Sequence, residues 1–154
     1  MACALGDVLL LSRKSEILFK MGMIAFALGH IVYTFAFSQT HYSYLDLMFF
    51  RYLIIAIATV FAFSFFLRLK PKLDDKDSVF VFTYTLIILL MIAASISRPN
   101  LQWQIFVPLA AVMFAVSDMF VASDRFVKPN SKNALAITPL YFGAQALFAL
   151  SVSI

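Results

Sequence analysis

The sequence has little charge, one cysteine and four glycines. Only 13% of its 154 residues are charged, against about 25% in a soluble domain. The polar surface is therefore too small to coat a water-soluble globule. A single cysteine, Cys3, excludes an intrachain disulfide, and no Cys/His spacing fits a metal site, so we expect neither metal nor cofactor. The net charge of +4 lies in short connectors, which argues against a nucleic-acid partner.

Hydrophobic residues are abundant and make up 63% of the chain, 18 phenylalanines among them. They form five long apolar segments, at 17–38, 47–67, 79–97, 102–122 and 134–154. Each approaches the ~20 residues with which a helix crosses the hydrocarbon layer, and helices satisfy their own backbone hydrogen bonds there. Residues 1–12 are also apolar but reach only about 18 Å as a helix. The sequence therefore predicts an all-α, polytopic transmembrane helix bundle. Residues 1–154 form one integral membrane domain with five full spans and a short N-terminal helix.

The basic residues are distributed unevenly between the two ends of these segments. Ten of the twelve lie in or beside the connectors at 13–20, 68–76 and 125–132: Arg13, Lys14, Lys20, Arg68, Lys70, Lys72, Lys76, Arg125, Lys128 and Lys132. Only Arg51 and Arg98 lie near the other connectors. The positive-inside rule then predicts that the Lys/Arg-rich loops are cytoplasmic. The membrane would be the inner membrane of a bacterial cell or the endoplasmic reticulum of a eukaryotic one.

Two of the eight acidic residues, Asp7 and Asp118, lie inside apolar runs rather than in connectors. An ionised carboxylate there costs roughly 2.5–3.5 kcal/mol on insertion scales, and such residues usually mark a functional site. A structural hydrogen bond between helices is the alternative. Each lies six residues before a polar boundary, about 9 Å deep by helical rise, so we expect both in one layer as catalytic candidates. Asp118 also shares a helical face with Ala111, Ala115 and Ala122, which predicts that it points toward protein.

Five other polar residues are candidates for lining a site in the same membrane region. Tyr84, Tyr141 and Gln145 lie in its cytoplasmic half, and His30 and Tyr33 share one face of a helix at greater depth. For Tyr84 and Tyr141, a packed ring with its hydroxyl bonded to a neighbour is at least as probable as a catalytic role. We interpret His30 as site lining rather than as a group that does chemistry.

The ordered set of these motifs resembles the YhhN/TMEM86 family of membrane proteins, which includes lysoplasmalogenases. The resemblance is carried by the run from Gly6 to Leu10, by Gly22, Phe26, Gly29-His30, Tyr33 and Phe37 on the next helix, by Ser117-Asp118 with Arg125-Phe126, and by Tyr141 and Gln145. It covers essentially the whole chain. Members of the family usually have more spans, so the resemblance implies that this chain lacks the first N-terminal spans.

The resemblance implies hydrolysis of the vinyl ether bond of a lysoplasmalogen. The products are a fatty aldehyde and glycerophosphocholine or glycerophosphoethanolamine, and the partners are a lysophospholipid-type amphiphile and the lipid bilayer. Hydrolysis of a vinyl ether needs a proton for carbon and a base for water, two roles that a pair of carboxyls divides in glycosidases. Either aspartate could be the acid. The alternative is a non-enzymatic transporter or lipid-binding protein that uses the acids as proton or cation sites. Without the resemblance, the residues favour an enzyme and a transporter about equally.

Overall fold

The computed structural model describes residues 2–10, 15–38, 48–96 and 106–152, which contain helices and no strand. The helices are α1 (Ala2–Leu10), α2 (Glu16–Ser38), α3 (Met48–Leu69), the short 3₁₀ helix η2 (Lys70–Lys72), α4 (Asp75–Ile96), α5 (Phe106–Phe126) and α6 (Ser131–Val152). Helices α2 to α6 are long and apolar enough to cross a membrane, whereas α1 is about 14 Å long by helical rise. The predicted all-α bundle is confirmed.

Two helices begin three or four residues before the predicted apolar segment, because polar side chains cap them. Asp74 Oδ1 accepts a hydrogen bond from the backbone N–H of Asp77 (2.6 Å), and α4 begins at residue 75 rather than 79. Asn130 Oδ1 accepts one from the N–H of Lys132 (3.0 Å), and α6 begins at 131 rather than 134. Hydropathy marks where a helix becomes apolar, while the cap decides where its hydrogen bonding starts.

The other boundaries agree with the prediction to within a few residues. Helix α2 begins at 16 instead of 17, α3 continues to 69 instead of 67, and α5 continues to 126 instead of 122. The predicted helix ends at 1, 11–12, 47, 97, 102–105 and 153–154 lie outside the described residues.

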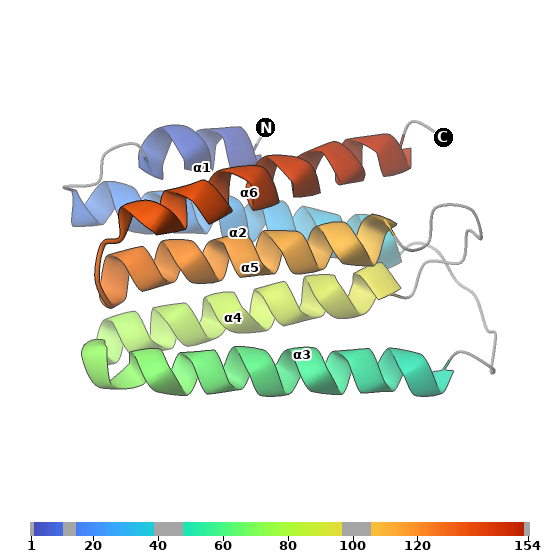
Figure 1. Cartoon of the computed structure of the whole chain (residues 1–154), viewed down its shortest axis with the longest axis horizontal. Coiled ribbons are helices and arrows are strands. Elements are labelled where there is room, and N and C mark those ends of the chain that lie inside the picture. The colour runs from blue at the N-terminus through green and yellow to red at the C-terminus, as the bar shows by residue number, and fades with distance from the viewer. Residues whose placement is uncertain (1, 11–14, 39–47, 97–105, 153–154) are drawn as a thin grey trace.

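The long helices run side by side, with α1 and α3 on opposite sides of the bundle (Figure 1). Helix α4 packs against α2, α3 and α5, while α5 packs against α6, and α1 against α2. The centre is sealed by Met91, Ala110, Ala111, Phe114 and Ala144, whose side chains have no exposed area. Large apolar side chains cover the outside, as expected for a surface that faces lipid.

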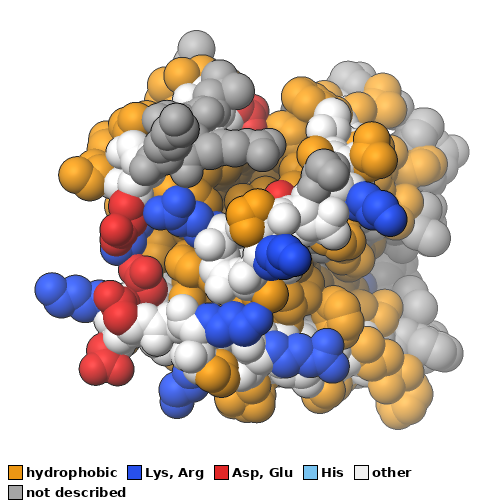
Figure 2. Space-filling view, turned by 60° about the vertical axis from the view of Figure 1, so that its left-hand side comes forward, with side chains coloured by type: hydrophobic (Ala, Val, Ile, Leu, Met, Phe, Trp, Pro, Cys, Tyr) orange, Lys and Arg blue, Asp and Glu red, His pale blue; other side chains and the backbone are white. Residues whose placement is uncertain are grey.

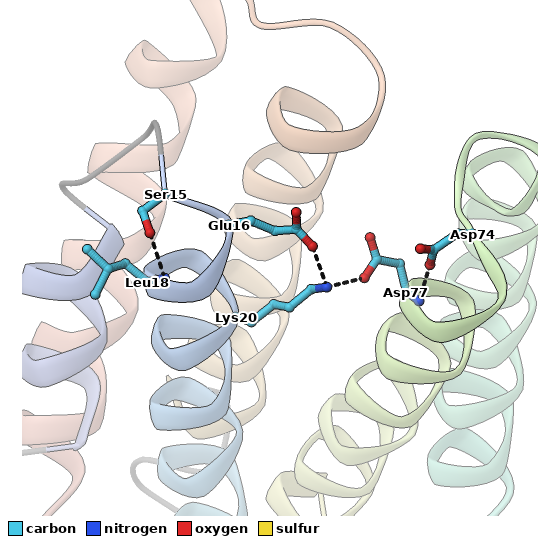
Figure 3. A network of polar contacts seen from close by, with 6 residues as sticks. All are labelled: Ser15, Glu16, Leu18, Lys20, Asp74 and Asp77. Carbon is cyan, nitrogen blue, oxygen red and sulfur yellow. Dashed lines mark hydrogen bonds and ion pairs between the residues drawn. The ribbon is translucent and has the colours of Figure 1, made fainter.

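Charged side chains gather at the end of the bundle where α2 begins and where α3 meets α4 and α5 meets α6 (Figure 2). We call this the basic end. The Lys20 ammonium forms ion pairs with Glu16 (2.6 Å) and with Asp77 of α4 (2.8 Å), so that it links α2 to α4 there (Figure 3). An ion pair therefore connects these two neighbouring helices at the basic end.

Candidate functional site

Asp118 on α5 is held by one side chain from α4 and one from α2. The Tyr84 hydroxyl donates a hydrogen bond of 2.7 Å to Asp118 Oδ2. His30 Nε2 lies 3.1 Å from the same oxygen and 3.3 Å from the Tyr84 hydroxyl. We call His30, Tyr84 and Asp118 the Asp118 cluster. It joins three helices by polar contacts in the interior of the bundle.

The small side chains of α5 explain why the neighbouring helices come this close. Ala111 and Ser117 are buried, with 0% and 1% exposure, and Ala115 keeps 9%. Small residues let helices approach each other closely in a membrane. The Asp118 side chain is 13% exposed, so the prediction that it points toward protein is confirmed.

His30 is completely buried, and its ring packs edge-on against Phe114 with 4.7 Å between centroids. Its Nδ1 has no hydrogen-bond partner among the described side chains. The sequence places His30 deeper than Asp118, yet the two are in contact. The predicted depth was counted in residues from the end of each helix. Such a count does not include the offset between the ends of neighbouring helices. His30 is therefore a direct partner of the carboxyl rather than a distant part of the lining.

Asp7 on α1 forms a separate pair. The Tyr141 hydroxyl of α6 donates a hydrogen bond of 2.7 Å to Asp7 Oδ2. The other two candidates also pair with each other, since the Tyr33 hydroxyl donates to Gln145 Oε1 (3.1 Å). The seven candidates thus form three polar groups, and each group spans at least two helices.

The two carboxyls are not in direct contact. Among the residues that the structure describes, no hydrogen bond joins Asp7 to Asp118. The Phe114 ring lies between Tyr141, the partner of Asp7, and His30, a partner of Asp118. Phe114 contacts the ring of Tyr141 (5.2 Å between centroids) on one side and that of His30 on the other. The structure therefore brings the acids into one bundle interior but not onto one shared hydrogen bond.

Cys3 is a neighbour that sequence reasoning missed. Its side chain is partly buried and packs against the core cluster that contains Phe26, Phe114 and Tyr141. A lone cysteine in a short apolar segment gives no signal of such a position. Only the packing of α1 against the bundle brings it to this core.

A cavity of about 250 Å³ lies beside the Asp118 cluster. Its walls come from α2, α3, α4 and α5, together with Leu10 of α1, and are almost entirely apolar. Asp118 and Tyr84 line it, whereas Asp7, His30, Tyr33, Tyr141 and Gln145 do not. In the described part of the chain no three His, Cys, Asp or Glu side chains are grouped as metal ligands would be. The arrangement offers a carboxyl with two polar partners at the wall of an apolar chamber.

One known protein family matches nearly the whole chain. The sequence model of one family, described as the YhhN family, matches residues 1–152. The searches of curated proteins and of solved structures found no match.

Proposed function

Since the chain belongs to the YhhN family, as its motifs indicate, we propose that it is a membrane-embedded hydrolase of lysoplasmalogenase type. It cleaves the vinyl ether bond of a lysoplasmalogen, and the products are a fatty aldehyde and glycerophosphocholine or glycerophosphoethanolamine. The observation that carries the proposal is the Asp118 carboxyl, which lies at the wall of an apolar cavity with Tyr84 and His30 bonded to one of its oxygens.

The chemistry requires one proton to reach carbon and one water to lose a proton. Protonation of the second alkenyl carbon gives an oxocarbenium ion at the first. Water adds there, its proton passes to a base, and the resulting hemiacetal collapses to the aldehyde and the free glycerol hydroxyl. A positioned acid or base contributes about 10²–10⁴-fold to such steps. No redox partner or cofactor is needed to balance them.

We assign the base to Asp118 and the acid to Asp7. Asp118 Oδ2 already accepts the Tyr84 hydrogen bond and lies within reach of His30 Nε2, which leaves Oδ1 for water or substrate. Asp7 is partly buried and has one donor, Tyr141. Because Asp7 does not line the cavity, its proton reaches the substrate only when the substrate or Phe114 shifts from the present packing.

Substitution of each aspartate by asparagine in the purified protein tests the proposal. Asp118→Asn and Asp7→Asn should each lower aldehyde release, measured by mass spectrometry, by about 100-fold or more. Asp75→Asn, at an exposed position in the first turn of α4, is the matched control and should keep wild-type activity.

The same assay separates an enzyme from a transporter. Wild-type protein in liposomes that releases no aldehyde but moves intact lysoplasmalogen across the bilayer would show that the acids serve transport. Full activity in Asp118→Asn would remove this residue from the chemistry.

A further inference from the structure

The cavity extends well beyond the carboxyl. Along α4 its wall continues from Tyr84 to Ile92, eight residues or about 12 Å by helical rise. Along α5 it extends from Asp118 four residues toward the basic end, to Ala122. Asp118 therefore divides the cavity into a short part near the basic end and a longer part that reaches toward the middle of the bundle.

The longer part of the cavity is apolar and opens sideways. Its walls include Ile57, Ala58, Ile88 and Val112. The side chains of Ile57 and Val112 are 60% and 40% exposed. They are exposed because α3 packs mainly on α4 and leaves the side that faces α5 open. In a membrane that opening faces lipid. An apolar chamber excludes water and accepts apolar guests, so a membrane amphiphile can enter from the bilayer.

The short part of the cavity ends beside a cation. Phe19 lines the cavity, and the Arg125 guanidinium lies 4.9 Å from the centre of its ring. Arg125 follows Asp118 by seven residues, about 10 Å along α5. Several Lys and Arg side chains lie at this end of the bundle, together with acidic ones (Figure 2). The phosphate of a lipid head group is attracted to these cations, and an uncharged hydrocarbon chain is not.

We infer that the cavity binds the single hydrocarbon chain of a lysophospholipid, with its head group at the basic end and its first carbons beside Asp118. The inference rests on the proposed function for the choice of substrate. The order of features along the cavity matches the order along the ligand. Cations lie near the phosphate, the carboxyl lies beside the ether carbons, and apolar side chains surround the tail.

A probe that the proposed chemistry cannot cleave tests binding apart from catalysis. The probe is a saturated ester-linked lysophosphatidylcholine with a photoreactive diazirine in mid-chain, added to the purified full chain in nanodiscs. After illumination, mass spectrometry of peptides should locate the label on the cavity-facing residues of α3, α4 and α5.

Paired substitutions on α3 make the test specific. Ala58 lines the cavity, whereas Ala56 is exposed on the same helix and does not line it. Ala58→Phe should lower the labelling at least about tenfold, and Ala58→Leu should lower it less. Ala56→Phe adds the same volume on the outside and should label like wild type. Thermal unfolding identifies any variant that does not fold, and Ala58→Leu is the milder substitution for that case.

The outcomes distinguish this inference from the proposed function. Labelling of the cavity without aldehyde release from lysoplasmalogen would refute the hydrolase and leave the chain site standing. Aldehyde release with label spread evenly over the lipid-facing helices, or with Ala58→Phe equal to Ala56→Phe, would overturn the chain site. A second copy of the chain that crosslinks across the α3–α5 opening and excludes the probe would overturn it too.

Discussion

The Tyr84 hydroxyl on α4 donates a 2.7 Å hydrogen bond to Asp118 Oδ2 on α5, across 34 positions of sequence. This bond fixes the carboxyl at the cavity wall. Its partner helices are adjacent in the chain, and the bond lies close to the point where His30 of α2 reaches the same oxygen.

Removal of the Tyr84 hydroxyl should slow the reaction without unfolding the protein. A hydrogen bond to a charged group contributes about 1.5–3 kcal/mol, so Tyr84→Phe should lower the rate of aldehyde release by roughly 10- to 100-fold. Steady-state kinetics on the purified variant measures this. Tyr52→Phe, at a 63% exposed tyrosine of α3, is the control and should match wild type. An unchanged rate in Tyr84→Phe would mean that the hydroxyl does not act on Asp118 during turnover.

His30 should act as a positioning residue for Asp118. His30→Phe removes the polar contact while it keeps an aromatic ring against Phe114, so kcat should fall and KM should stay near wild type. His30→Gln retains an N–H donor and should recover part of the lost kcat. If both variants changed KM and left kcat alone, His30 would act in substrate binding instead.

Gly6 should be needed for the position of α1 and therefore of Asp7. A Cβ on Gly6 would lie 2.7 Å from two ring carbons of Phe26, which is itself only 5% exposed. Overpacking of this kind costs about 1–3 kcal/mol, so Gly6→Ala should lower the unfolding midpoint and the activity together.

The matched control for that variant is Gly143→Ala. A Cβ on Gly143 would also meet an atom at 2.7 Å, but that atom is the terminal Cε of the flexible Met113 side chain. Met113 can move aside, so Gly143→Ala should unfold near the wild-type temperature. Equal losses in the two variants would show that the Gly6 contact with Phe26 has no special role.

Phe114 should be a main source of stability in the interior. Its ring has no exposed area and packs against Phe26, His30 and Tyr141. Phe114→Ala should cost about 3–5 kcal/mol of unfolding free energy, measured by unfolding in detergent. Phe142→Ala changes a ring that is 62% exposed on α6 and should have a small effect. A small effect at both positions would contradict the central role of this ring.

The sequence was informative about single helices. Apolar length predicted five spans and a short first helix, and the small residues beside Asp118 predicted that it points inward. Hydropathy could not predict the starts of α4 and α6, because the side chains of Asp74 and Asn130 set them outside the apolar segments.

The sequence did not predict which polar residues meet. It grouped Asp7 with Asp118 by depth, whereas the structure pairs Asp7 with Tyr141 and Asp118 with Tyr84 and His30. It also gave no sign that Cys3 packs against the buried core. Depth along a helix follows from residue count, but a contact between helices depends on their order, rotation and offset.

The sequence by itself determined that this chain is a bundle of membrane-spanning helices with two carboxyls in its apolar part, because hydropathy and helical rise act locally along the chain. The tertiary structure alone decided that Asp118 lines an apolar cavity, while Asp7 lies outside it and pairs with Tyr141, whose ring packs against Phe114. The physical reason is that a cavity exists only where side chains from several helices fail to fill the space between them, and no single segment encodes that space.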